Sequence, residues 1–186
     1  MVVLRAFLNF PDEAALIGRM LAGYADLEID LMNCVNAVRG NLDTVLKVMF
    51  RSRGETRRIE MADALARQHY HQLKIGKEYE QSISAVRHCM RIRNQYAHCV
   101  WWDDNSGQLA FANLEEVAKK NAVVKDLRKL TTKYVNIDLL KEQFAYFEYA
   151  DNLLVWLNYK ARELKGQPPQ PNQVLPKQLE QPQLYL

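Results

Sequence analysis

A long segment with the hydrophobic periodicity of an α-helix constrains the fold of this chain more than any other feature. From about Pro11 to Val38, apolar residues recur at steps of three and four, as one face of a helix requires. Pro11 suits a first helical position, and the two acidic residues after it favour the positive end of the helix dipole. A second long helix is expected from about Ile137 to Leu164, with Asn136 or Asp138 as its cap. These patterns favour an all-α fold.

Three more helices are predicted between these two. They cover about residues 42–50, 56–73 and 77–99. The glycines at positions 40, 54, 76, 107 and 166 fall at the ends of inferred elements, which supports this division. The predicted architecture is an antiparallel bundle of four to five helices with one short β-hairpin insertion.

The hairpin is expected directly after the last of these three helices. Val100–Trp102 and Leu109–Phe111 are apolar and flank Asp103–Gln108, a polar stretch that contains turn residues. Strands are expected only in this hairpin. Residues 113–135 are ambiguous and are interpreted as a short helix and a loop.

The C-terminal residues differ in composition from the rest of the chain. Residues 166–186 hold five of the six prolines, together with six glutamines. This composition buries too little apolar surface to offset the entropy lost on ordering, so a disordered Pro/Gln-rich tail is predicted. The expected organisation is a helical domain at residues 1–165 followed by the tail at 166–186.

Charge and cysteine usage limit the functional classes. The net charge is only +3, but residues 39–93 hold twelve Lys/Arg against six acids. This excess fits a polyanion partner and a solvated basic face equally well. The three cysteines lack the spacing of a disulfide framework or a zinc site, so a reduced cytoplasmic setting is expected, with no metal or cofactor. The N-terminus does not fit a signal peptide, and no apolar run reaches the length of a membrane span.

The hexapeptide Arg93-Asn94-Gln95-Tyr96-Ala97-His98 points most directly to a function. On an ideal helix, five residues correspond to about 500°, so Arg93 and His98 would lie about 140° apart, whereas Asn94 and His98 share a face. Within one subunit, the arginine and the histidine converge only if the helix ends or bends near His98. Two such helices packed side by side would bring both groups to one cleft.

Each of these side chains suits the cleavage of a phosphodiester. An imidazole exchanges protons near neutral pH, so His98 could take the proton of a ribose 2′-hydroxyl or give one to the leaving 5′-oxygen. The guanidinium of Arg93 offers a planar set of donors to the phosphate. Asn94 could orient the histidine or the phosphate. Arg93, Asn94 and His98 are therefore the predicted catalytic residues, and this chemistry needs no metal ion.

The hexapeptide, followed by Trp101-Trp102, resembles the R-x4-6-H signature of HEPN domains. These all-helical modules occur in many prokaryotic RNA-cutting toxins and in eukaryotic RNA-decay and stress enzymes. The resemblance implies a homodimer with a composite site, and metal-independent cleavage that leaves a 2′,3′-cyclic phosphate and a 5′-hydroxyl. It also implies a toxin or phage-defence role, with an antitoxin or a nucleotidyltransferase as candidate partners. The helix pattern is similar over residues 12–164, but the specific similarity lies in residues 93–102.

Six other arginines are candidates for contact with RNA. They are Arg51, Arg53, Arg57, Arg58, Arg87 and Arg91. The first four fit a phosphate-contacting rim and a solvated loop equally well. Arg91 is also a second candidate for the motif arginine, although the asparagine after Arg93 favours Arg93.

The remaining histidines and the tryptophan pair favour structural interpretations. His69 and His71 are expected on the surface, because a spacing of two residues points them to different sides of a helix. His88 is expected to be partly exposed. Trp101 and Trp102 could stack on a base, but packing of the hairpin against helices is favoured.

The sequence therefore predicts a metal-independent endoribonuclease of HEPN type that acts on RNA as a homodimer. One alternative is a non-catalytic helical dimer that binds a protein or a nucleotide. Another is a HEPN partner of a nucleotidyltransferase, in which the helical protein is the substrate or the inhibited toxin.

Overall fold

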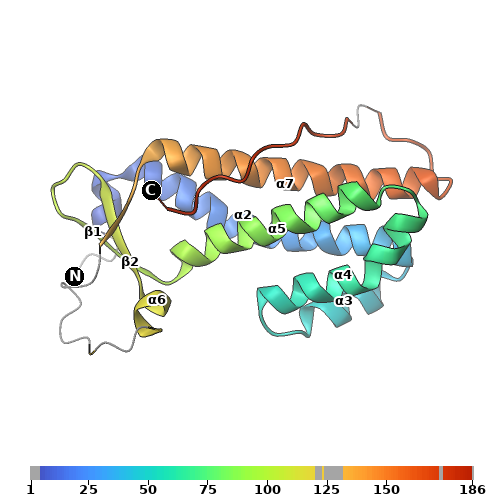
Figure 1. The fold of residues 1–186 in the computed structure, drawn as a ribbon, viewed down its shortest axis with the longest axis horizontal. Helices are drawn as coiled ribbons and strands as arrows, with labels where there is room; N and C mark the ends of the chain where they lie inside the picture. The colour runs from blue at the N-terminus through green and yellow to red at the C-terminus, as the bar shows by residue number, and fades with distance from the viewer. Residues whose placement is uncertain (1–4, 120–122, 124–131, 172–173, 186) are drawn as a thin grey trace. The chain divides into compact units, whose positions relative to one another are not determined.

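The computed structural model of the chain describes residues 5–119, 123, 132–171 and 174–185. These residues are mainly helical and include a small antiparallel sheet (Figure 1). The helices are α1 (Ala6–Asn9), α2 (Pro11–Arg39), α3 (Leu42–Phe50), α4 (Glu55–Gln72), α5 (Gly76–Ala97), α6 (Leu114–Ala118) and α7 (Ile137–Leu164). The strands are β1 (Cys99–Asp103), β2 (Leu109–Asn113) and β3 (Lys133–Val135). The prediction of a mainly helical fold is confirmed.

The helices predicted from periodicity form close to their predicted limits. The bounds of α2 and α7 agree with the prediction to within one residue. The α5 helix ends earlier than expected, at Ala97, because Cys99 already pairs with Asn113 as the first residue of β1. Helix α1 was not predicted. None of the helices in the described ranges combines the length and apolar character needed to cross a membrane.

The predicted hairpin forms, but the expectation that strands occur only there is wrong. β1 and β2 pair antiparallel with Trp101 opposite Phe111, and β3 pairs with the other edge of β2 with Lys133 opposite Phe111. β3 is too short for alternation to be recognised in the sequence, and it lies in the segment with an ambiguous pattern. That segment also contains α6, whereas its residues 120–122 and 124–131 lie outside the described residues.

The chain divides into two compact units, and each is described by itself. Unit 1 comprises Met1–Ala22, Arg91–Ala145 and Pro182–Leu186, and unit 2 comprises Gly23–Met90 and Tyr146–Gln181. One helical domain over residues 1–165 stays a prediction, and so does the antiparallel arrangement of the helices as a bundle.

The core of unit 2 is built from buried aromatic side chains with bonded hydroxyl groups. The rings of Tyr70 and Tyr79 are stacked 4.4 Å apart, and the Tyr70 hydroxyl donates to the backbone oxygen of Cys34 at 2.9 Å. Burial raises the pKa of the Cys34 thiol to about 12. The expectation that His88 is partly exposed is wrong, because the residue is buried and its ring forms a T-shaped pair with that of Tyr146. Helices α3 and α4 pack together in this unit (Figure 1).

The core of unit 1 gathers around the sheet. Phe111 is fully buried at its centre, and the Trp101 ring stacks on it at 5.1 Å. Tyr96 from α5 and Phe7 from α1 also pack against Trp101. Trp101 therefore packs the hairpin against helices, which is the interpretation favoured from the sequence.

The described residues of the tail form no helix or strand but make specific contacts. In unit 2, the amide of Gln181 donates to the hydroxyl of Ser84 at 3.3 Å. In unit 1, the amide of Gln143 donates to the backbone oxygens of Gln183 and Leu184 at 2.8 and 3.3 Å. The disorder predicted for the tail concerns its motion and stays a prediction.

Candidate functional site

His98 lies at the point where α5 gives way to the sheet of unit 1. The helix ends at Ala97, so His98 is the first residue beyond it. Its backbone oxygen accepts a hydrogen bond from the amide of Leu114 at 2.9 Å. The helix therefore ends near His98, which is what the convergence of His98 and Arg93 within one subunit requires. The angle of about 140° expected between them on an ideal helix no longer applies.

Asn113 joins the end of α5 to the start of α6. Its Nδ2 atom donates to the backbone oxygens of Asn94 and Gln95 at 3.1 and 3.0 Å. Its Oδ1 atom accepts from the amides of Glu115 and Glu116 at 2.9 and 3.2 Å, as a helix N-cap does. One buried side chain thus satisfies backbone groups at two helix ends and fixes the position of α6 relative to His98.

Glu115 lies beside the imidazole of His98. The distance from His98 Nε2 to Glu115 Oε1 is 3.4 Å, and each side chain is 55% exposed. A carboxylate at this position can orient the imidazole and leaves it accessible to a substrate. Glu115 was not predicted as a site residue, because the segment that contains it has an ambiguous sequence pattern. Asn113, with acidic residues at the second and third positions after it, was nevertheless a start signal for a helix.

Arg93 and Asn94 are paired with each other. The Nη1 atom of Arg93 donates to Oδ1 of Asn94 at 3.0 Å, and both residues are half-buried. Asn94 therefore contacts the arginine, whereas the sequence left open whether it would orient His98 or a phosphate. The three motif residues all belong to unit 1, with the arginine held by Asn94 and the histidine beside Glu115.

The thiol next to this site is poorly suited to act as a nucleophile. Burial, with a smaller contribution from the charge of Glu116, raises the pKa of Cys99 to about 12. The thiol is therefore protonated at neutral pH, and a protonated thiol reacts slowly. Nucleophilic catalysis by Cys99 is disfavoured.

Five of the six candidate RNA-contacting arginines lie in unit 2, whereas Arg91 lies with the motif in unit 1. The Arg58 guanidinium donates to Glu28, whose side chain is only 7% exposed, at 2.7 Å. Arg57 pairs with Glu60 at 3.0 Å on the surface. Pairing with Glu28 occupies Arg58 in a partly buried contact. Contact of these arginines with RNA stays a prediction.

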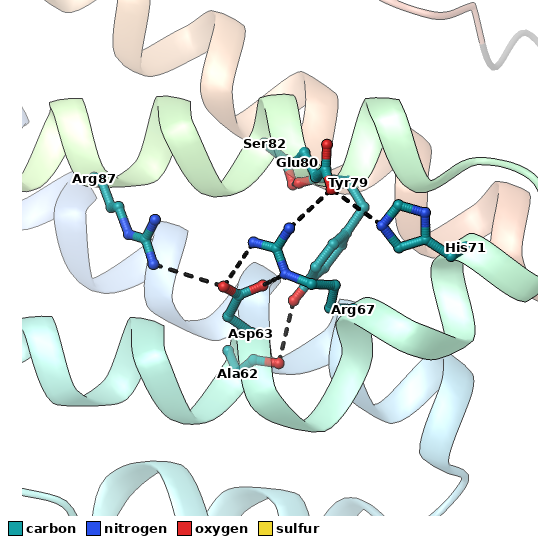
Figure 2. Close-up of polar contacts among 8 residues, drawn as sticks. All are labelled: Ala62, Asp63, Arg67, His71, Tyr79, Glu80, Ser82 and Arg87. Carbon is teal, nitrogen blue, oxygen red and sulfur yellow. Dashed lines mark hydrogen bonds and ion pairs between the residues drawn. The ribbon is translucent and has the colours of Figure 1, made fainter.

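A polar cluster joins α4 and α5 within unit 2. Arg67 lies between Asp63 and Glu80 (Figure 2) and donates to their carboxylates at 2.8 to 3.0 Å. Arg87 lies 3.6 Å from Asp63. His71 Nε2 lies 3.0 Å from Glu80, which confirms a surface position for this histidine. The hydrogen bonds that Arg67 donates to Asp63 raise the pKa of Arg67. The charges offset one another inside the cluster, so we assign it the structural role of holding α4 to α5.

Comparison of the chain with models of protein families, with curated proteins and with solved structures gave no match.

Proposed function

We propose that this chain is a metal-independent endoribonuclease of HEPN type that works as a homodimer. The observation that carries the proposal is the end of α5 at Ala97, directly before His98. His98 therefore leaves the helix surface beside Glu115, while Arg93 stays on the last turn, held by Asn94. Exposure of 55% for the imidazole makes it accessible to a large substrate.

The proposed reaction is attack by a ribose 2′-oxygen on the adjacent phosphorus. His98 takes the 2′-hydroxyl proton as the bond from the 2′-oxygen to phosphorus forms. The bond from phosphorus to the 5′-oxygen breaks, and the imidazolium returns the proton to that leaving oxygen. The products are a 2′,3′-cyclic phosphate and a 5′-hydroxyl. Arg93 donates to the phosphate oxygens, whose charge grows in the transition state.

The dimer is part of the proposal because two α5 helices packed side by side would bring the arginine of one subunit and the histidine of the other to a common site. Arg93 is bonded to Asn94 and His98 lies near Glu115. We place Arg93 of one subunit opposite His98 of the partner subunit, with a second, equivalent centre related by the two-fold axis. A role as a toxin or phage-defence component, restrained by an antitoxin or a nucleotidyltransferase, belongs to the same proposal.

The test is cleavage of RNA by purified wild-type protein in a chelator, beside His98→Ala, Arg93→Ala and Asn94→Ala. His69→Ala serves as the control, because His69 belongs to unit 2 and pairs with Arg39. Loss of a proton-transfer group should lower the rate by about 10²–10⁴-fold. Mapping of the product ends should show the cyclic phosphate. Intact RNA with the wild type, or equal cleavage by wild type and His98→Ala, would refute the proposal and favour the binding module.

A further inference from the structure

The last described residues of the chain are held by a defined set of side chains in unit 1. We call Phe111, Glu116, Lys133 and Gln143 the Tyr185 seat. The Tyr185 ring stacks on Phe111 with 6.3 Å between centroids and 28° between planes. The Nζ atom of Lys133 lies 3.4 Å from the centroid of the same ring. The Tyr185 hydroxyl donates to Oε1 of Glu116.

The sheet builds the floor of this seat. Phe111 and Lys133 are opposite each other on β2 and β3, so they point to the same face. Lys133 is also held by an ion pair with Glu116 at 2.6 Å. An aromatic ring, a cation and a carboxylate are therefore fixed next to one another. Together they fit a flat ring with a hydrogen-bond donor on its edge.

Gln143 adds a hydrogen-bond donor that faces the tail. This side chain is fully buried, and its Oε1 atom accepts from the Tyr96 hydroxyl at 2.8 Å. That bond turns the amide nitrogen towards the backbone oxygens of Gln183 and Leu184. A buried amide that loses such acceptors is costly, so the seat favours an occupant that offers carbonyl oxygens.

The seat is connected to the candidate catalytic site through α6. Two consecutive residues of this helix contact the two sites. Glu115 lies beside His98, and Glu116 accepts a hydrogen bond from Tyr185. Tyr96, which orients Gln143, belongs to the same hexapeptide as His98. An occupant of the seat is thus held by the residue that directly follows Glu115, the neighbour of His98.

We propose that the Tyr185 seat is a nucleobase subsite beside the candidate catalytic site, and that residues 182–185 of the chain occupy it in competition with RNA. This inference rests on the proposed function. A base offers a planar ring to Phe111 and Lys133, edge N–H groups to Glu116 and a carbonyl oxygen to Gln143. Guanine matches best, because two adjacent N–H donors fit a carboxylate and O6 fits the amide donor.

The experiment measures binding rather than cleavage. Three proteins are compared: the wild type, a chain that ends at residue 181, and the full-length Tyr185→Ala variant. Each is titrated with short fluorescent single-stranded RNAs that repeat one combination of bases and contain no run of guanines. Each is also titrated with GMP, AMP, CMP and UMP. Removing the competitor should tighten RNA binding by about tenfold, the value of one base stack. GMP should bind best. Tyr185→Ala retains the backbone contacts to Gln143, so it covers the case in which the shorter chain fails to fold.

Matched variants locate any gain in affinity. In the shortened chain, Lys133→Met and Glu116→Gln should abolish the gain, whereas His98→Ala should keep it. A synthetic peptide of residues 178–186 should displace the RNA. Equal binding by all three proteins, or a gain that persists in Lys133→Met and Glu116→Gln, overturns the inference, as does a seat that binds the peptide but no nucleotide.

The two proposals fail in distinguishable ways. RNA that binds more tightly after removal of the tail but is never cut supports the base subsite and refutes the nuclease. RNA that is cut through His98 without any effect of the tail on binding supports the nuclease and refutes the base subsite.

Discussion

The Oε1 atom of Glu115 lies 3.4 Å from the Nε2 atom of His98 at the first position beyond α5. The two residues come from separate elements, and Asn113 holds those elements together. Because both side chains are more than half exposed, water and salt screen their attraction. We therefore assign Glu115 to orientation of the imidazole and expect only a small contribution from it to stability.

Glu115→Gln should lower the rate of RNA cleavage only modestly. Exposed ion pairs contribute at most about 1 kcal/mol, which corresponds to about fivefold in rate. Initial rates at low salt measure the loss, and high salt should narrow the difference between wild type and variant. Asp138→Asn is the control, because it removes an exposed carboxylate 3.8 Å from Lys141 at the start of α7. A loss as large as that of His98→Ala would show that Glu115 itself transfers the proton.

Asn113→Ala should destabilise the protein more than the loss of an ordinary helix cap. The change removes the cap of α6, about 1 kcal/mol, and also removes the amide donor to two backbone oxygens of α5, so we expect about 2 kcal/mol in total. The oxygen of Gln95 keeps its bond from the Cys99 thiol, at 2.8 Å. Asn136→Ala is the matched control, since Asn136 only accepts from the amide of Leu139, at 2.8 Å. Urea unfolding measures both values. Equal losses would show that the link from Asn113 to α5 contributes nothing.

The stability of unit 2 should fall as the pH rises from about 4 to about 6. Burial, and then the hydrogen bond and charge of Asp30, raise the pKa of Asp151 to about 6, with Asp26 also contributing. The folded state therefore binds more protons than the unfolded state in this range, and stability is lost as Asp151 ionises. Asp151→Asn should remove this dependence and stabilise the protein at pH 7 by about 1 kcal/mol, after allowance for solvent screening. Denaturant unfolding at pH 4.5 and pH 7 checks both statements, and a variant that keeps the pH dependence would contradict the assignment.

Gly76 and His71 should be energetically coupled at the turn between α4 and α5. A Cβ at position 76 would lie 2.4 Å from Nδ1 of His71, so Gly76→Ala forces the ring away from Glu80. In a His71→Ala background the same change should stabilise α5 by up to about 1 kcal/mol, because alanine favours helix over glycine. A double-mutant cycle by thermal unfolding measures the coupling. Additive effects would mean that the ring moves without cost.

The sequence allowed the long helices to be predicted because periodicity over many turns is a redundant signal. For α2 and α7 the spacing of the apolar residues and the residues at the helix ends indicated the same limits of the helix. The end of α5 was placed too late, because nothing local in the helix marks Ala97 as its last residue. Pairing of Cys99 with Asn113 across the sheet determines it.

The candidate site could be predicted only in part, because tertiary contacts between distant segments determine the rest of it. Arg93, Asn94 and His98 are neighbours along the chain and form a recognisable motif. Glu115, Lys133 and Tyr185 come from segments distant in sequence with weak patterns, and tertiary contacts alone bring them near the motif. Apolar and polar patterning does not specify such contacts.

The pairing of Arg93 with the partner subunit's His98 is tested most directly by a purified heterodimer of Arg93→Ala and His98→Ala subunits. In the composite arrangement one of its two centres keeps both groups, so it should cut RNA at about half the wild-type rate, whereas each variant homodimer is slower by about 10²–10⁴-fold. Differently tagged subunits allow the heterodimer to be isolated before the assay. A heterodimer as inactive as the two homodimers, beside an active wild type, would contradict a site shared between subunits.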